Sequence, residues 1–203
     1  MADPLFVSYY TNDKYKAYAN DRLAPSLRKL GLEFEIDYVP TLGDWLRETH
    51  YKPAFVLQKL ERHRDRDVIW IDVDCEVLEF PELLFDVPQD RLIAAHYSTL
   101  NPEGRRMLYN TVVYLRNVPH VRHLVISWLA ENAIHPADRT DQVNLENVLD
   151  AESRRQHPPS WGWLFELPPT YCWIDYAMAG PLKGMKPVIA HFHEARERWA
   201  FKP

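Results

Sequence analysis

Cysteine is scarce in this chain, which carries only Cys75 and Cys172. Two cysteines are too few for a disulfide framework or a zinc cluster. Cys75 also falls in a segment that is predicted to be a buried strand. We therefore expect both residues to be reduced thiols.

An excess of positive charge is also missing, since 24 Lys and Arg stand against 29 Asp and Glu and the formal net charge is −5. General nucleic-acid binders depend on a basic surface, so we expect no nucleic-acid partner. No uncharged stretch approaches the roughly 18–20 residues that cross a bilayer. The N-terminus lacks the charged region and the apolar segment of a signal peptide. These absences predict a cytoplasmic protein with no transmembrane segment.

Short apolar runs alternate with helical patterns through most of the 203 residues. This alternation predicts an α/β protein with a mostly parallel sheet and helices on both faces. The length suits one domain that spans residues 1–203. Strands are expected at residues 5–10, 33–39, 68–71, 91–96 and 108–115. Helices are expected at 15–30, with a kink at Pro25, and at 143–149. Further helices are expected to begin after Asp44, at Pro53 and at Pro119, and the one after Asp44 is short.

The composition changes after residue 151, where prolines and aromatic residues replace charged ones. We interpret 151–190 as irregular Pro- and Trp-rich structure laid over the sheet, not as a linker between domains. Its Trp161, Trp163 and Tyr171 are either a platform for a sugar ring or core residues.

Two carboxylates, Asp72 and Asp74, directly follow the apolar run 68–71. Such a run, bounded by charge, is typical of a strand covered on both faces. Positions i and i+2 of an extended chain point to the same side, and ligands of α/β sheets bind beyond the carboxyl ends of strands. Two like charges held together need a cation, of which a divalent metal is the simplest. The plain alternative is a pair of solvated turn residues.

Two chemistries use this pair of carboxylates. In one, a bound metal neutralises a diphosphate leaving group. In the other, Asp72 is a phosphoryl-accepting nucleophile and Asp74 a general acid, as in haloacid-dehalogenase-like phosphatases. Those phosphatases usually carry Gly-Thr after the pair and place it near the N-terminus, whereas Cys75 and Glu76 follow here. The sequence therefore favours the metal–diphosphate site.

Over most of its length the chain resembles nucleotide-diphosphosugar-dependent glycosyltransferases of the GT-A fold, which carry a DxD motif. The order of the matching parts is more specific than any one of them. The parts are the strand that ends at Tyr10-Thr11, the helix start Lys52-Pro53, the motif Ile71-Asp72-Val73-Asp74, the segment Asn110–Tyr114, the helix start Asp141-Gln142, the expected strand Leu167–Tyr171 and the late His191.

The resemblance implies a metal site in which Asp74 and His191 are ligands and Asp72 contacts the metal or the donor's ribose. His193 is the competing imidazole ligand. Carboxylate and imidazole ligands suit Mn²⁺, and Mg²⁺ is also acceptable. A lone histidine can equally be a structural residue.

The resemblance also implies a donor site. Tyr10 and Thr11 would contact the nucleotide base, and the alternative is a core ring and a helix cap. Lys52 would contact the diphosphate or an acidic residue of the site, and Arg196 would contact the diphosphate, for which arginine is well suited. Both basic residues can instead be solvated, and Glu194 departs from the usual spacing before Arg196.

Asp141 and Gln142 would act on the reacting sugar or the acceptor, or Asp141 would only stabilise a helix N-terminus. The implied activity is transfer of a sugar from a UDP- or GDP-sugar to an acceptor hydroxyl, with 151–190 on the acceptor side and the acceptor a glycan, a lipid-linked sugar or a protein. The late His and Asp141-Gln142 favour retention of the anomeric configuration. In an inverting enzyme, Asp141 would be the base. A non-catalytic sugar-nucleotide or glycan-binding module remains the third alternative.

Overall fold

The computed structural model describes residues 2–99, 104–155, 161–174, 178 and 180–192. Their strands are β1 (Leu5–Tyr10), β2 (Phe34–Tyr38), β3 (Val68–Ile71), β4 (Cys75–Val77), β5 (Ile93–Ser98), β6 (Met107–Leu115), β7 (Leu164–Leu167) and β8 (Ile189–His191). Their helices are α1 (Asp13–Tyr18), the π-helical η1 (Ala19–Leu23), α2 (Ala24–Lys29), α3 (Trp45–His50), α4 (Lys52–Arg62), α5 (Glu82–Phe85), α6 (Pro119–Ile134), α7 (Asp141–Arg155) and the 3₁₀ helix η2 (Pro169–Tyr171).

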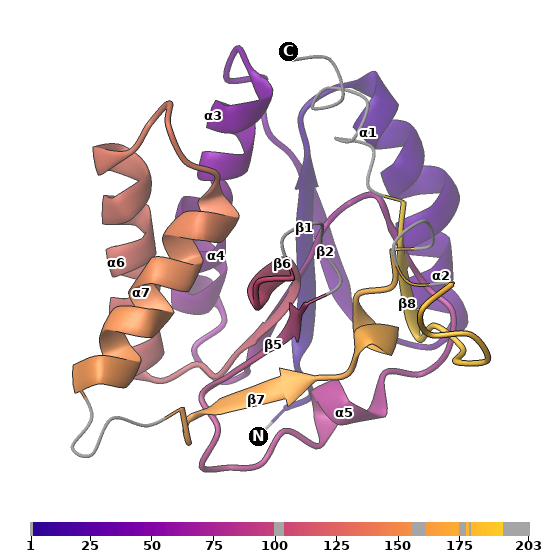
Figure 1. Cartoon of the computed structure of the whole chain (residues 1–203). Helices are drawn as coiled ribbons and strands as arrows, with labels where there is room; N and C mark the ends of the chain where they lie inside the picture. The colour runs from indigo at the N-terminus through magenta and orange to yellow at the C-terminus, as the bar shows by residue number, and fades with distance from the viewer. Residues whose placement is uncertain (1, 100–103, 156–160, 175–177, 179, 193–203) are drawn as a thin grey trace.

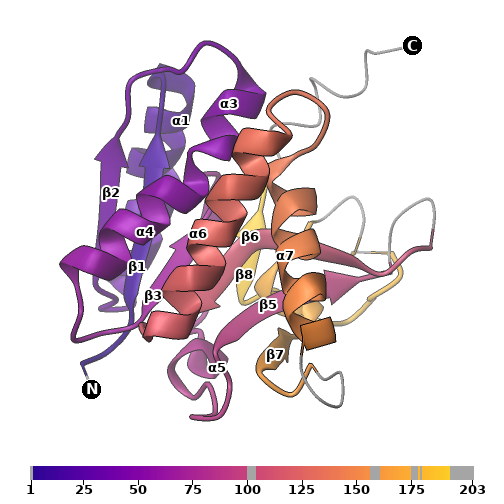
Figure 2. The same ribbon diagram turned by 90° about the vertical axis from the view of Figure 1, so that its left-hand side faces the viewer.

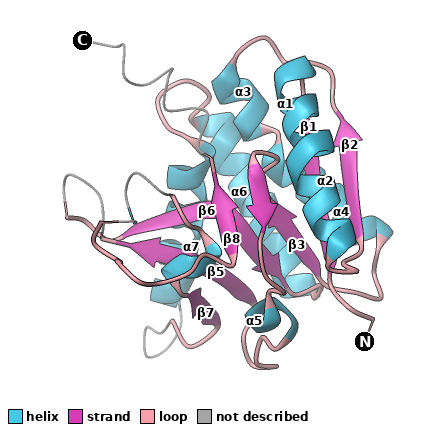
Figure 3. Ribbon diagram, turned by 90° about the vertical axis from the view of Figure 1, so that its right-hand side faces the viewer, coloured by secondary structure: helices cyan, strands magenta, loops and turns pink. Residues whose placement is uncertain are grey.

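The main sheet has six strands in the order β2-β1-β3-β6-β5-β7. Strand β1 runs parallel to β2 and β3, and β7 runs parallel to β5, whereas β6 is antiparallel to both β3 and β5. Helices α4, α6 and α7 cover one face (Figure 2), and α1 and α2 cover the other (Figures 1 and 3). The predicted single α/β domain with a mixed, mostly parallel sheet is confirmed.

Strand β3 lies inside the sheet and is buried on both faces. Val68 and Trp70 pack into the core under α4, α6 and α7, and Ile69 and Ile71 pack into the core on the opposite face. The continuous apolar run is required because neither side of this strand meets water. The prediction for this segment is confirmed.

The helix predicted over 15–30 consists of three stretches, α1, η1 and α2. Pro25 stands in the first turn of α2, directly after the π-helical turn. Proline has no N–H to donate to a preceding carbonyl, and a π turn is one way for a helix to accommodate a missing bond. The irregularity in this helix is a π turn that ends directly before α2, the helix that contains Pro25.

The prediction of irregular structure over 151–190 is wrong in part. Helix α7 continues to Arg155, β7 adds an edge strand beside β5, and β8 pairs with β4. The strand expected over 167–171 is also wrong, because β7 ends at Leu167 and Pro169–Tyr171 form the 3₁₀ helix η2. Trp163 and Tyr171 are buried, and Trp161 packs against the core and stacks on Trp163. A four-residue strand followed by proline gives little periodicity, which is why the sequence did not show β7. Residues 156–160, 175–177 and 179 lie outside the described residues.

No helix among the described residues is long and apolar enough to cross a membrane. This agrees with the absence of a long apolar run in the sequence.

A buried lysine joins α4 to the edge strand β2. Lys59 is 1% exposed, and its Nζ contacts Glu35 Oε2 and, at 2.7 Å, Asp37 Oδ2. Partial burial raises the pKa of Glu35, but the hydrogen bond and charge of Lys59 outweigh this effect and the pKa is lowered. The pair therefore stabilises the fold above the unfolded pKa of Glu, about 4.3, and loses this contribution as the pH falls through the folded pKa.

We expect Lys59→Met to lower the free energy of unfolding by about 1–2 kcal/mol at pH 7, because the methionine keeps the packing of the stem while Glu35 and Asp37 regain water. The difference from the wild type should shrink as the pH falls from 7 to about 3, because protonation of Glu35, whose folded pKa is lowered by Lys59, removes the ion pair. Urea unfolding at the two pH values measures it, with the exposed Lys29→Met as control. A pH-independent difference would contradict the ion-pair interpretation.

Candidate active site

A cavity of about 490 Å³ opens at the carboxyl ends of β1 and β3, beside the start of α7. The described residues that were predicted to hold the metal, the donor and the reacting sugar all line it. These residues are Tyr10, Thr11, Lys52, Asp72, Asp74, Asp141, Gln142 and His191. The predictions for Arg196 and His193 lie outside the described residues.

The sheet topology explains why these residues converge. Strands β1 and β3 are parallel, so they end at the same edge, and the antiparallel β6 passes there. The N–H of Asp72 donates to the carbonyl of Thr111 at 2.9 Å, which fixes the end of β3 against the middle of β6. Side chains of three strands therefore meet at one cavity wall.

The sequence predicted an extended chain through the two acidic residues, and this prediction is wrong. The chain turns after Ile71, and the N–H of Cys75 donates to the carbonyl of Asp72 at 3.1 Å. Both carboxylates nevertheless approach one imidazole: His191 Nε2 is 3.3 Å from Asp74 Oδ1 and 3.9 Å from Asp72 Oδ2. The turn, and not strand alternation, brings the pair together.

His191 is held by a small second sheet. Strand β8 pairs with β4 so that His191 lies opposite Cys75, and the N–H of His191 donates to the carbonyl of Trp173 at 2.8 Å. Its Nδ1 is 3.2 Å from Thr111 Oγ1, so a proton on Nδ1 leaves the Nε2 lone pair facing the carboxylates. Burial lowers the pKa of His191, but the neighbouring Asp74 outweighs it and the pKa is raised.

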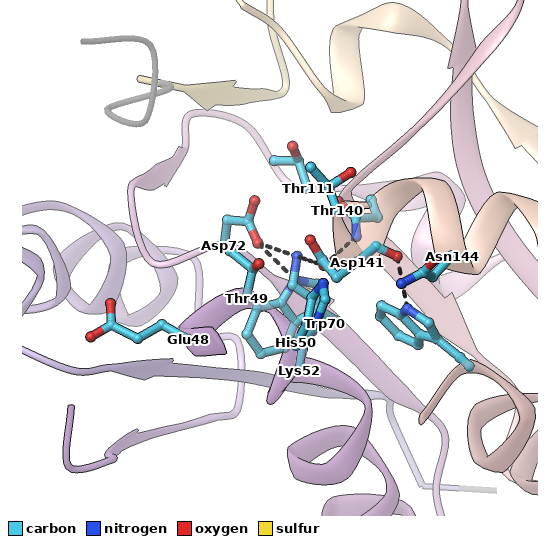
Figure 4. Close-up of polar contacts among 12 residues, drawn as sticks. Glu48, Thr49, His50, Lys52, Trp70, Asp72, Thr111, Thr140, Asp141 and Asn144 are labelled. Atoms are coloured by element: carbon cyan, nitrogen blue, oxygen red, sulfur yellow. Dashed lines mark hydrogen bonds and ion pairs between the residues drawn. The ribbon is translucent and has the colours of Figure 1, made fainter. Parts of the chain in front are cut away.

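The buried Lys52 supplies the cation between two carboxylates, but the pair is not the one expected. Its Nζ lies 3.0 Å from Asp72 Oδ1 and 3.1 Å from Asp141 Oδ2, as Figure 4 shows. Burial lowers the pKa of Lys52, and the charges of Asp141 and Asp72 outweigh it, so the pKa is raised. Burial raises the pKa of Asp72, and Lys52 and His191 offset this only in part. The need for a cation at Asp72 is thus met within the chain.

Asp141 is fixed by further donors that the sequence analysis did not assign. Asn110 Nδ2 donates to Asp141 Oδ2 at 2.7 Å, and Trp128 Nε1 donates to its main-chain carbonyl at 2.8 Å. Thr140 Oγ1 accepts the N–H of Val143 at 3.3 Å and so caps α7. Because Thr140 serves as the cap, the Asp141 carboxylate is available to the cavity.

Trp70 was also missed as a site residue. Its Nε1 donates to Asp72 Oδ1 at 2.9 Å, and its ring lies 5.0 Å from Lys52 Nζ. Its position two residues before Asp72 was a usable signal, because alternate residues of a strand share a side. Asn110 offered no comparable local signal, since its approach to Asp141 depends on the tertiary fold.

Aromatic rings border the cavity at the end of β1. The rings of Tyr10 and Tyr38 are 5.6 Å apart, and Tyr10 is partly buried against the core. Asn12, not Thr11, caps α1, through an oxygen that accepts the N–H of Tyr15 at 3.1 Å. Thr11 is therefore not needed as a cap and lines the cavity. Trp161, Trp163 and Tyr171 are not among the described residues that line it, so the proposed sugar platform is not at this cavity.

The carboxylate–imidazole group fits a divalent ion. Neighbouring ligands of an octahedral ion at about 2.1 Å lie about 3 Å from each other. The separation of 3.3 Å between His191 Nε2 and Asp74 Oδ1 is close to this value, and Asp72 Oδ2 at 3.9 Å is within reach of a small side-chain rotation. Thr111 on the far side of the imidazole is the kind of outer partner that orients a histidine ligand.

No protein-family model and no curated protein sequence gives a significant match to the chain. Among solved structures, the fold is similar to "Crystal structure of a glycosyltransferase involved in the glycosylation of the major capsid of PBCV-1", with a TM-score of 0.70 at 11% sequence identity. The match covers 95% of this chain and 94% of that one. At this identity the likeness is one of fold, so the chain shares the α/β fold of a glycosyltransferase of known structure.

Proposed function

We propose that this protein is a metal-dependent glycosyltransferase that moves a sugar from a UDP- or GDP-sugar to an acceptor hydroxyl. The observation that carries the proposal is the convergence of Asp74, His191 and Asp72 on one wall of a cavity. The aromatic end of β1 borders the same cavity, and the fold is that of a known glycosyltransferase. The proposed acceptor is a hydroxyl group of a glycan, a lipid-linked sugar or a protein.

The ion-binding residues in this proposal are Asp74 and His191, with Asp72 as a third oxygen ligand. Mn²⁺ or Mg²⁺ held there would supply positive charge to the departing diphosphate. The contact with Thr111 orients the His191 ring for binding the ion. Tyr10 and Thr11 would bind the nucleotide base, by ring stacking and by a hydroxyl hydrogen bond.

Asp141 is the proposed residue beside the reacting sugar, with Gln142 next to it. Lys52 and Asn110 both contact Asp141 Oδ2, so the carboxylate is oriented by two donors. Such a group suits the stabilisation of an oxocarbenium-like sugar better than the removal of a proton from an acceptor. For this reason we favour a retaining reaction. Arg196 is kept as a proposed diphosphate contact on sequence grounds alone.

Binding of a sugar nucleotide should stabilise the folded chain. At a ligand concentration of about 100 times Kd the gain is about 2.7 kcal/mol, which corresponds to a rise in Tm of about 5–10 °C for a chain of this size. Thermal unfolding with UDP- and GDP-sugars, with Mn²⁺ and with a chelator, measures it. The rise should occur with one of the two nucleotides and require the metal.

The alternative activities give different results in the same preparation. Unchanged Tm values with all sugar nucleotides would count against the proposed function. Release of phosphate from a monoester with an acyl-phosphate on Asp72 would replace it by a phosphatase. A metal-dependent rise in Tm without turnover would indicate a binding module.

A further inference from the structure

The thiol of Cys75 lies beside the carboxylate–imidazole pair. The possible ligand atoms of Asp74, Cys75 and His191 all lie within 4.8 Å of one another. The three residues are 7%, 0% and 8% exposed. Cys75 is not among the described cavity-lining residues, so its thiol stands on the core side of the pair, whereas Asp72 stands on the cavity side.

The pairing of β4 with β8 produces this arrangement. Cys75 and His191 are direct partners in the antiparallel register, and directly opposite side chains share a face with Cβ atoms about 5 Å apart. The turn from Asp72 to Cys75 then brings the Asp74 carboxylate to the same imidazole, at 3.3 Å. In a strand, the side chains of Asp74 and Cys75 would point to opposite faces. Here the turn brings both of them to the same imidazole.

A sulfur ligand changes which ions such a site prefers. Mg²⁺ and Mn²⁺ favour oxygen ligands, whereas Zn²⁺ and Co²⁺ also accept thiolate and imidazole. Catalytic zinc sites often have three protein ligands and one open position, and ligands on a tetrahedral ion are about 3.5 Å apart. The present group reaches that geometry by side-chain shifts of roughly 1 Å.

We propose that Cys75 is a metal ligand and that Asp74, Cys75 and His191 together bind a thiophilic divalent ion such as Zn²⁺ or Co²⁺. Binding forms a sulfur–metal bond and releases the thiol proton to solvent, with no change of oxidation state. The inference rests on the proposed function for the use of Asp74 and His191 as ligands, and it adds sulfur to that set. The bound ion's fourth position would face the cavity.

Cobalt titration of the metal-free full chain tests the proposal without a sugar nucleotide. A cobalt–thiolate bond gives an intense near-ultraviolet charge-transfer absorption that oxygen and nitrogen ligands do not give. We expect this band in the wild type and in Cys172→Ser, which changes the other fully buried thiol, and not in Cys75→Ser. Competition titration should show Zn²⁺ affinity lowered about tenfold or more in Cys75→Ser, with Mn²⁺ affinity within about twofold of the wild type.

A wild type without the band, or a Cys75→Ser protein with the same band, would overturn the proposal. Zinc X-ray absorption of the unaltered protein gives a second measurement that needs no variant. A sulfur neighbour at about 2.3 Å supports the proposal, and a shell of nitrogen and oxygen alone at about 2.0–2.1 Å contradicts it. Either result can occur whether or not sugar nucleotides bind, so the two proposals fail separately.

Discussion

Asp74→Asn is expected to lower Mn²⁺-dependent sugar transfer by more than about 100-fold, since loss of an outer-sphere partner alone typically costs 10–100-fold. Asp74 is 7% exposed, and its Oδ1 is the carboxylate oxygen nearest to His191 Nε2. The amide keeps the size of the side chain and removes the negative charge that a divalent ion needs. Metal titration and initial rates on the same protein would show the loss in both quantities.

Glu76→Gln is the matched control for this change. Glu76 lies two residues further along, in β4, and its partner across the strand pair is Ala190 rather than the imidazole. It is not among the described residues that line the cavity. We expect its rate and metal affinity to stay within about twofold of the wild type, as for surface changes away from such features. If Asp74→Asn kept near-wild-type activity with Mn²⁺, the metal site would have to be elsewhere.

Lys52→Met is expected to lower the free energy of unfolding by about 3–5 kcal/mol, which corresponds to a fall in Tm of roughly 6–20 °C. The lysine is 4% exposed and its ammonium contacts both Asp72 and Asp141. Methionine retains most of the packing of the stem, but it leaves Asp141, whose side chain is 6% exposed, with little access to water, and it removes the cation beside Asp72. Removal of one partner of a buried ion pair is costly for this reason.

Two comparisons separate charge from packing at Lys52. The double variant Lys52→Met with Asp141→Asn should recover part of the lost stability, because one of the two unpaired charges is then absent. Lys59→Met removes a lysine that is also buried, but its partners Glu35 and Asp37 have side chains that are 25% and 46% exposed and regain water. Equal losses of stability in Lys52→Met and Lys59→Met would contradict the role assigned to burial of the carboxylates.

Much of the fold followed from local pattern. The apolar run 68–71 identified a strand buried on both faces, and Pro119 marked the start of α6. Asp44 caps α3 as expected, because its carboxylate accepts the N–H of Arg47. These features depend on residues within a few positions of one another, so periodicity and capping preferences were sufficient. Strand β7 was not found because four residues at a sheet edge carry little periodic information.

The sequence by itself determined that the acidic pair, Lys52 and Asp141 meet at one cavity, because strand ends and helix starts meet at one edge of an α/β sheet. Only the tertiary structure decided how they pair. Lys52 serves Asp72 and Asp141, while His191 approaches Asp74 and Cys75. These contacts depend on the antiparallel pairing of β6 with β3 and on the pairing of β4 with β8. Both are pairings between segments distant in the chain, and no local pattern encodes their register. The acidic pair therefore predicted the place of a cation site, and the fold determined which cation each carboxylate meets.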